Sequence, residues 1–487
     1  MSPETAVWLA PAIPLAGAPL IALARRSPNL REAVTLITAA VLFLVVLQLV
    51  PEVMAGGRPA VTLLEMLPGL TLTFEVEPLG MVFAVVASFL WIVTSIYSIG
   101  YMRGHHEKNQ TRFYVCFALA LSSAMGVAFA GNMLTLFIFY EALTLTTYPL
   151  VTHSGTKEAV AAGRSYLGIL LATSIGLQLL AIVWTWTLTG TLDFTTGGIL
   201  QGHASPAMAA LLYALFLFGI GKAAIMPLHR WLPAAMVAPT PVSALLHAVA
   251  VVKAGVFTVL KVSVYLFGID FLAEAGASQW LMYVAAATIL IASLVALKQD
   301  NLKRRLAYST ISQLSYIVLG ATLANGLGAI GGGMHIAMHA FGKITLFFCA
   351  GAIDVALHKK QVSEMRGIGR AMPVTMTAFL IGSLSIIGLP PFGGLWSKWY
   401  LGLGTLEAGE YALLAVLMIS SLLNVAYLLP IPIRAFFSPA EKGNEASGLK
   451  EAPLPCVLAF SVTALGCLFL FFFPEPLFRV LSLMVPG

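Results

Sequence analysis

Five lysines lie inside long apolar segments of this sequence, where a charged side chain is costly. They are Lys222, Lys253, Lys261, Lys343 and Lys398. A lysine at the centre of a membrane-spanning helix costs about 2.5–3.5 kcal/mol on insertion scales. None of the five is arginine, which keeps its proton, whereas a buried lysine can release its proton. The choice of lysine therefore indicates proton transfer within an apolar environment.

The alternative for each lysine is that its long stem carries the ammonium to the membrane surface. Lys261 lies near the outer end of its apolar segment, so we expect this behaviour there first. Lys222, Lys253 and Lys343 each lie about 20 Å from the start of their segments, at a rise of 1.5 Å per residue. These three are the stronger candidates for chemistry.

Glu141, in the segment LTLFIFYEALTLTTY, is the one carboxylate that the sequence places deep in an apolar run. With several buried lysines available, we predict an ion pair between Glu141 and Lys222. Loss of this contact would favour the neutral lysine, because burial and the removal of a counter-charge both disfavour the ammonium. Such a pair would connect a small helix movement to proton release.

His335, His339 and Lys343 follow one another at intervals of four residues. This spacing places them on one helix face, along about 12 Å. Histidines four residues apart can also form half of a zinc site, but Ile336 stands where the H-E-x-x-H pattern has its glutamate. The sequence therefore predicts a protonatable ladder and no metal site.

His247 and Lys253 lie six residues apart and do not share a helix face, so we expect them to contact different neighbours. Histidine titrates near neutral pH. We therefore predict that His247, like His335 and His339, relays protons through bound water.

The composition predicts an all-α polytopic membrane protein. Of 487 residues, 59% are hydrophobic and 10% are charged, against about 25% charged in a typical soluble domain. A bilayer accommodates such a chain in helical spans of about 20 residues. Fourteen apolar windows predict about 14 spans, at 5–24, 33–51, 80–102, 112–130, 132–152, 163–188, 207–227, 240–267, 277–297, 305–323, 327–356, 372–401, 408–437 and 452–473.

The distribution of basic residues supports this count. Of the 27 Lys and Arg residues, twenty lie in loops that follow odd-numbered spans, whereas the loops after even-numbered spans hold only Arg58. Because Lys and Arg favour cytoplasmic loops, we expect a cell inner (plasma) membrane protein with both termini on the non-cytoplasmic side. Arg25 and Arg26 follow the first span, so that span is expected to be a retained helix. The net charge of +6 follows from this topology, and nucleic acid is not an expected partner.

The spans divide the chain into four parts. We expect three N-terminal spans with an outer cap in 1–103, a five-helix repeat in 104–268, a second repeat in 269–437, and a cytoplasmic link (438–451) with the last span in 438–487. The alternating stretch TLTFEVE in the outer cap predicts a small hairpin.

Two spans carry a proline break at corresponding places in the two repeats. The breaks are at Met226-Pro227 and at Pro390-Pro391, with Lys222 and Lys398 beside them. The first repeat leaves from a basic loop and the second from a loop without Lys or Arg, so the repeats are predicted to be inverted. Paired broken helices in inverted repeats are typical of secondary transporters, with the ion site near the midplane.

These motifs resemble the antiporter-like subunits shared by respiratory complex I, membrane-bound hydrogenases and Mrp-type sodium/proton antiporters. The similarity covers roughly residues 75–430. The motifs are Glu141 in FxxxEALTL, Lys222 before MPLHRWLPAAMVAPTPVSALLHA, NLKRRLAYSTISQLSY at 301–316, HxxxHAxxK at 335–343 and GLPPFGGLWSKW at 388–399.

The resemblance implies a role for each candidate residue. Glu141 and Lys222 would form a regulating pair, and Lys253 with His247 a central relay. His335, His339 and Lys343 would continue that relay, and Lys398 would be the terminal donor. Lysine at this last position, and a chain that stops after the fourteenth span, resemble the D-type Mrp subunit.

The residues and the resemblance together predict a proton-translocating subunit of a multisubunit monovalent cation/proton antiporter. We expect it to work with other membrane subunits and to move protons, with sodium or potassium as the counter-ion. The alternatives are a membrane-arm subunit of an NADH:quinone oxidoreductase or hydrogenase pump, a bicarbonate-uptake partner, and a non-conducting scaffold. The four cysteines and the rest of the sequence contain no nucleotide, flavin, cluster or haem motif, so we expect no cofactor.

Overall fold

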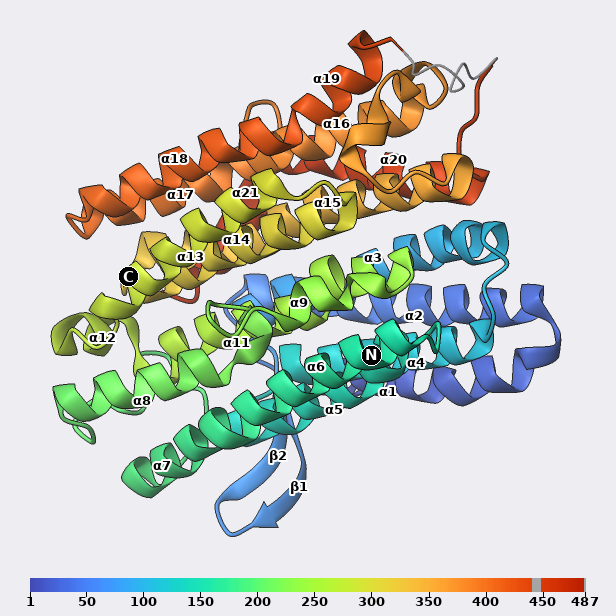
Figure 1. Cartoon of the computed structure of the whole chain (residues 1–487). Helices are drawn as coiled ribbons and strands as arrows, with labels where there is room; N and C mark the ends of the chain where they lie inside the picture. Colours follow the sequence, from blue (N-terminus) through green and yellow to red (C-terminus); the bar gives the residue numbers. More distant parts are fainter. Residues whose placement is uncertain (440–447, 486–487) are drawn as a thin grey trace.

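A computed structural model describes residues 1–439 and 448–485, so most of the predicted link 438–451 lies outside the described residues. The described chain is a bundle of helices from which one β-hairpin stands out (Figure 1). The N-terminal part contains α1 (Pro3–Leu23), α2 (Pro28–Met54), β1 (Ala60–Leu67), β2 (Leu70–Glu75) and α3 (Pro78–Gly104). The antiparallel β1–β2 pair is the predicted hairpin of the outer cap.

The predicted first repeat, 104–268, runs from α4 to α11, and the predicted second repeat, 269–437, runs from α12 to α19. The first contains α4 (Gln110–Ala128), α5 (Met133–Val151), α6 (Lys157–Thr173), α7 (Leu179–Thr189), α8 (Pro206–Gly219), α9 (Trp231–Ala234), α10 (Thr240–Ala244) and α11 (Val251–Lys261). The second contains α12 (Ile269–Ala275), α13 (Gln279–Lys298), α14 (Leu302–Thr322), α15 (Gly326–Leu357), α16 (Pro373–Ile387), α17 (Gly394–Glu407), α18 (Tyr411–Leu428) and α19 (Pro430–Phe437). The chain ends with α20 (Leu454–Phe472) and α21 (Glu475–Ser482). In Figure 1 the later helices, yellow to red, lie together above the earlier ones, blue to green.

Eleven helices among the described residues are long and apolar enough to cross a membrane, and they coincide with eleven of the predicted spans. The other three predicted spans fall on shorter or more polar helices: 207–227 on α8, 305–323 on α14, and 372–401 on α16 and α17. The polytopic all-α fold is thus confirmed, while the count of fourteen membrane crossings stays a prediction.

Three helices begin at asparagine caps, and two of them, α5 and α15, carry candidate residues. Asn132, Asn301 and Asn325 accept backbone hydrogen bonds in the first turns of α5, α14 and α15, at 2.8, 3.0 and 2.8 Å. Such a cap satisfies a backbone N–H that has no partner within the helix. Each of these helices therefore starts at a residue that the local sequence fixes.

Both predicted helix breaks are present. After α8 the chain forms a single 3-10 turn, Gly221–Ala223, and Ala224 then adopts a left-handed conformation with φ 56°. Between α16 and α17, Gly388 takes φ 89° before the Pro390-Pro391 peptide. The break is in the fourth predicted span of each repeat, which supports the paired organisation. The inverted orientation of the two repeats stays a prediction.

The loops gather as the basic-residue alternation predicts. One cavity is lined by loop residues that follow the third, fifth, seventh, ninth and eleventh predicted spans. Two others, of 490 and 240 Å³, are lined by residues that follow even-numbered spans. We call the first end of the molecule the basic face and the other end the opposite face.

Lys261 does not extend to the surface, so that expectation is wrong. Its side chain is fully buried, and its Nζ lies 3.1 Å from Glu77 Oε1 and donates to the backbone oxygen of Ala130 at 2.7 Å. Glu77 caps α3 by accepting from the backbone of Leu79 and Gly80. Glu77 is therefore a second deep carboxylate, and the pair fixes the end of α11 against the start of α3.

We predict that Lys261→Met lowers the thermal stability of the protein in detergent. Removing one partner of a buried ion pair typically costs about 3–5 kcal/mol, because the other charge stays buried. The midpoint of thermal unfolding should fall clearly for Lys261→Met and much less for Lys261→Arg, which keeps the charge. Equal midpoints for Lys261→Met and the parent protein would show that the pair does not fix the two helices.

Candidate functional site

Lys222 lies on the 3-10 turn after α8 and is fully buried. Its Nζ donates to the backbone oxygen of Tyr140 at 2.8 Å and to Thr144 Oγ1 at 2.6 Å. The same ammonium lies 3.2 Å from the centroid of the Tyr140 ring, and the Lys222 backbone N–H donates to the Tyr140 hydroxyl at 3.1 Å. The break in the helix thus holds Lys222 against one turn of α5.

The predicted ion pair between Lys222 and Glu141 is not formed in this structure. No oxygen of Glu141 lies within 4.0 Å of the Lys222 ammonium, and neither oxygen has a hydrogen-bond partner among the described residues. Lys222 instead contacts the residue just before Glu141 and the residue three positions after it. Lys222 and Glu141 both lie at this turn of α5 but do not pair, because Tyr140 and Thr144 already accept hydrogen bonds from the ammonium.

Gly255 on α11 allows the backbone of Lys222 to approach closely. A Cβ atom at this position would lie 2.3 Å from the carbonyl carbon of Lys222 and 2.4 Å from the nitrogen of Ala223. Only glycine leaves room for this contact. Gly255 therefore sets the position of the Lys222 turn relative to α11, the helix that carries Lys253.

Lys253 and His339 form a direct contact between the two repeats. Both are fully buried, and Lys253 Nζ lies 2.6 Å from His339 Nδ1. At this distance one of the two nitrogens must accept, so either the lysine or the histidine is neutral. The sequence predicts both residues as relay groups, and the structure brings them together.

His335 lies next along α15, with its ring centroid 5.7 Å from that of His339. Its Nδ1 lies 2.8 Å from Ser397 Oγ and its Nε2 lies 3.1 Å from Gln313 Oε1. A serine hydroxyl can donate or accept. His335 can therefore be neutral or protonated without losing a hydrogen bond.

Lys398 is on α17, one residue after the Ser397 that contacts His335. Its Nζ donates to the backbone oxygen of Ile387 at 2.9 Å and to Ser421 Oγ at 3.1 Å. It also lies 5.0 Å from the ring centroid of Tyr316, which stacks on His335 at 5.6 Å. The carbonyl of Ile387 is available because α16 ends there at the predicted break.

Lys343 and His247 lie beside the series of residues formed by Lys253, His339, His335 and Lys398. Lys343 Nζ donates to Ser309 Oγ at 2.5 Å, and Ser309 contacts the hydroxyl of Tyr427 at 2.7 Å. His247 packs on the ring of Phe347 with a centroid distance of 4.7 Å. Neither ring nitrogen of His247 has a hydrogen-bond partner among the described residues, although the side chain is fully buried.

The structure thus groups the eight predicted site residues into three sets. The sets are Glu141 with Lys222, then Lys253 with His339, His335 and Lys398, and lastly Lys343 and His247 beside the second set. The sequence analysis missed the neutral groups between them. These are Tyr140, Thr144, Ser309, Gln313, Tyr316 and Ser397. Three of them, Tyr140, Thr144 and Ser397, lie inside motifs that contain a candidate charge, and this proximity is the signal that could have identified them.

Comparison with known proteins shows the family of the chain. Residues 130–424 match the family described as NADH:quinone oxidoreductase/Mrp antiporter, TM, and residues 69–114 match NADH-Ubiquinone oxidoreductase (complex I), chain 5 N-terminus. NADH-quinone oxidoreductase subunit N of Desulforudis audaxviator is 35% identical over 389 residues, covering 78% of this chain and 75% of that protein. Hydrogenase-4 component B of Escherichia coli is 31% identical and covers 81% of this chain and 62% of that protein.

A solved structure shows the same fold. A chain of the Mrp complex from a Dietzia species superposes with a TM-score of 0.87 at 22% identity, covering 99% of this chain and 97% of that chain. Some other curated relatives are longer, and the chain spans about half of the NAD(P)H-quinone oxidoreductase chain 5 of Synechocystis, at 49% of its length.

The fold and the buried basic path define the class of antiporter-like, multi-pass membrane subunits. The chain belongs to the NADH:quinone oxidoreductase/Mrp antiporter membrane family. The family resemblance seen in the five motifs is confirmed.

We predict that Gly255→Ala destabilises the protein by displacing the Lys222 turn. The added methyl group would overlap backbone atoms rather than the end of a flexible side chain, and overpacking of this kind typically costs about 1–3 kcal/mol. The measurement is the midpoint of thermal unfolding in detergent. Gly168→Ala on α6 is the matched control, since a Cβ there meets nothing within 4 Å. Equal midpoints for the two variants would contradict the close approach.

Proposed function

We propose that the chain translocates protons as one membrane subunit of a multisubunit complex. The observation that carries this proposal is the contact of Lys253 with His339, two buried basic groups from different repeats at 2.6 Å. A purely structural contact would be better served by an apolar pair, because burying a charge is expensive. A shared proton gives the contact a purpose, since it can lie on either nitrogen.

The proposed path continues from this contact along α15 and α17. A proton on His339 passes to His335, whose ring lies 5.7 Å away, through intervening water. Ser397 and Gln313 hold the His335 ring in place in both protonation states. Lys398 follows as the terminal group, next to Ser397 in the chain and over the ring of Tyr316.

Glu141 and Lys222 form the proposed switch of this path. Lys222 is held by Tyr140 and Thr144, while the Glu141 carboxylate has no hydrogen-bond partner among the described residues. An unpaired buried carboxylate is unfavourable. Movement of the Lys222 side chain toward Glu141 would form the predicted ion pair and remove positive charge from the side of α11. The present arrangement corresponds to the separated state of the switch.

For the parent complex we infer a monovalent cation/proton antiporter, with this chain as a D-type Mrp subunit in the inner membrane. The fold likeness to the Mrp complex of Dietzia over 99% of the chain, together with lysine at position 398, supports this assignment. Both termini are proposed to lie on the non-cytoplasmic side, because the basic loops share the other face.

The second candidate is a membrane-arm subunit of a redox-driven pump. The identity of 35% to an NADH-quinone oxidoreductase subunit and of 31% to a hydrogenase component favours it. Purification of the intact complex in mild detergent separates the two. Small membrane subunits alone support the antiporter, and soluble iron–sulfur subunits support the redox pump.

We predict that Lys222→Ala and Glu141→Ala each reduce proton flux in everted membrane vesicles by about 100-fold, the range seen when a proton-transfer group is removed. The complex should still assemble, because neither change creates a steric clash. Lys298→Ala is the control, since this lysine is exposed at the end of α13. Unchanged flux in an assembled Lys222→Ala complex would exclude the proposed switch.

We also predict that Lys253→Arg abolishes proton flux as fully as Lys253→Met. Arginine keeps the positive charge but does not release its proton at any physiological pH. Lys253→Arg keeps the charge, and Lys253→Met keeps an unbranched side chain for packing. A scaffold subunit needs only one of these properties. If the chain were a scaffold, the membranes would therefore retain a proton gradient in at least one of the two variants. Lys157→Arg, at an exposed position on α6, is the matched control for the substitution itself.

A further inference from the structure

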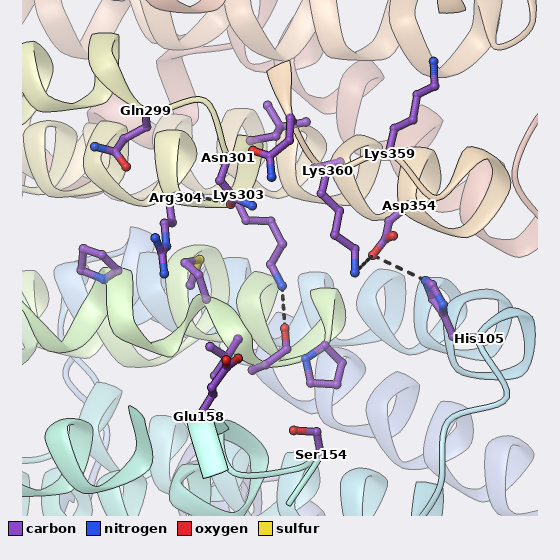
Figure 2. Close-up of a pocket in the computed structure, with 18 of the residues that line it drawn as sticks. His105, Ser154, Glu158, Gln299, Asn301, Lys303, Arg304, Asp354, Lys359 and Lys360 are labelled. Carbon is purple, nitrogen blue, oxygen red and sulfur yellow. Dashed lines mark hydrogen bonds and ion pairs between the residues drawn. The ribbon is translucent and has the colours of Figure 1, made fainter. Parts of the chain in front are cut away.

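A groove on the side of the helix bundle differs in chemistry from the cavity of the basic face. The basic-face cavity has a volume of about 790 Å³. Figure 2 shows the charged side chains of its wall, among them Lys303, Asp354 and Lys360, with Asp354 in an ion pair to Lys360. The groove has a volume of about 460 Å³, and every residue that lines it is apolar. It lies between α2, α3, α15, α20 and α21, and we call it the apolar groove.

The apolar groove lies in the half of the bundle next to the opposite face. Its lining residues Val50, Met81 and Leu470 are within four residues of the ends of α2, α3 and α20 on this side, where the β1–β2 hairpin connects α2 to α3. The lined stretches of α3 and α20, 81–89 and 462–470, each measure about 12 Å at a rise of 1.5 Å per residue. One leaflet of a bilayer's hydrocarbon core is about 15 Å thick. The groove therefore matches the depth of the lipid tails in one leaflet.

The groove is open to the side of the bundle but is narrow. Leu47, Val462 and Phe469, which line it, are 38, 41 and 60% exposed. A volume of 460 Å³ over a length of about 12 Å corresponds to a cross-section of about 40 Å², whereas a helix with its side chains is 10–12 Å across and has about 80–110 Å². Water does not fill such a space, because apolar cavities stay dry. The occupant that fits is a single hydrocarbon chain rather than a helix of another subunit.

The helix α21 lines the end of the groove at the opposite face and carries an arginine. Pro476, Leu477 and Val480 of this helix line the groove, whereas Arg479 is exposed. A helix that is apolar on one side and charged on the other is typical of a membrane surface. Among the described residues, no carboxylate lies within 4.0 Å of the Arg479 guanidinium, Glu475 on the same helix included. The Arg479 charge is therefore available to a ligand.

Phosphate is the ligand that suits a free arginine at this depth. The described residues outside the predicted spans place two basic side chains at the opposite face, Arg58 and Arg479. Arg58 is already paired, since its Nε lies 2.7 Å from Glu75 Oε1. A guanidinium binds phosphate through two parallel hydrogen bonds. A phospholipid with one tail in the groove would have its phosphate at the membrane surface, at the level of α21.

The inner wall of the groove is the back of α15, the helix that carries the proposed relay. Ala337 and Phe341 line the groove, and each follows a relay histidine, His335 or His339, by two residues. Two residues are about 200° apart on a helix of 3.6 residues per turn, so the groove and the histidines lie on opposite sides of α15. Phe341 also stacks on Phe89 of α3, with ring centroids 5.9 Å apart. An occupant of the groove would therefore support α15 from behind and hold it against α11.

We propose that the apolar groove binds one tail of a phospholipid from the leaflet at the opposite face, with the lipid phosphate at Arg479. The tail supplies van der Waals contacts to α3, α15 and α20 that an empty groove would lack. The lipid is thus part of the packing around the relay helix. This inference concerns a lipid site and does not depend on proton translocation by the chain.

The test counts the phospholipids that stay bound to the intact complex after washing in mild detergent, measured by native mass spectrometry. Val462→Trp places a large ring in the groove. Leu465→Trp is the matched control, because Leu465 is on the same helix, is 63% exposed and does not line the groove. Arg479→Gln removes the proposed phosphate contact, and Arg25→Gln, exposed after α1 at the basic face, is its control.

We expect Val462→Trp to retain one phospholipid fewer per copy of the chain than the parent, and Leu465→Trp to retain the same number as the parent. Palmitoyl-oleoyl phosphatidylglycerol added to the washed complex should raise the midpoint of thermal unfolding more for the parent and Leu465→Trp than for Val462→Trp, because a ligand of the folded state stabilises it. Arg479→Gln should need about tenfold more of this lipid for the same rise, since it loses a charge-assisted contact.

Equal numbers of bound phospholipids in Val462→Trp and Leu465→Trp would overturn the proposal. A cross-link from Val462→Cys to a membrane span of another subunit in the intact complex would also overturn it, because a partner helix would then cover the groove. Equal responses of Arg479→Gln and Arg25→Gln to the added lipid would exclude the phosphate contact. If Val462→Trp does not assemble, Leu47→Trp on α2, with the exposed Leu44→Trp as its control, gives the same two outcomes.

Discussion

The contact between Lys253 and His339 is the constraint on which the rest of the arrangement depends. Two unit charges 2.6 Å apart repel by about 6 kcal/mol even at an effective dielectric constant of 20. The doubly protonated state is therefore excluded, and the pair carries at most one positive charge. No carboxylate neutralises the pair directly, since the described ion pairs all lie elsewhere. Any change in charge near α11 or α15 therefore shifts the position of that proton.

Two further contacts fix the helix that carries Lys253. The Glu77–Lys261 pair fixes the far end of α11, two helical turns beyond Lys253. Gly255, two residues from Lys253, presses α11 against the backbone of the Lys222 turn. Lys222 itself lies outside regular helix, where its position depends on side-chain contacts to Tyr140 and Thr144. Lys253 thus lies on a regular helix, whereas Lys222, the charge that moves in the proposed switch, lies on a short irregular segment beside it.

Much of this fold can be predicted from the sequence, because apolar runs, prolines and basic loops each report on a strong physical preference. The helix breaks at Pro227 and at Pro390-Pro391 follow from the missing N–H of proline, and the hairpin follows from the alternation of TLTFEVE. The spacing of His335, His339 and Lys343 predicts their shared helix correctly. Their partners come from other helices, and periodicity within one helix does not identify a partner on another.

The two expectations about individual charges that the structure corrects share one cause. The sequence pattern places Glu141 near Lys222, and the structure places Glu77 beside Lys261. In both cases the hydrogen bonds formed locally determine whether the lysine and the carboxylate pair. Glu77 lies just before α3, at a position that hydropathy assigns to a loop, and the helix cap draws it into the buried region. At Lys222 the backbone oxygen of Tyr140 and the hydroxyl of Thr144 replace the carboxylate. Hydropathy measures how apolar a segment is and contains no information on such acceptors.

The surroundings of the buried lysines differ between the two predicted repeats, and this difference would give the proposed proton path a direction. In the first repeat Lys222 lies beside a turn that contains Glu141, so a nearby acid can compensate a proton. In the second repeat Lys343 contacts only the hydroxyl of Ser309, and that repeat has no fully buried carboxylate among its described residues. A proton that enters the second repeat is therefore uncompensated, since His335, His339, Lys343 and Lys398 are all basic. In the proposed path, such a proton is stable only while the adjacent basic groups are neutral. The arrival of a second proton would therefore favour release of the first proton from the next group along the path.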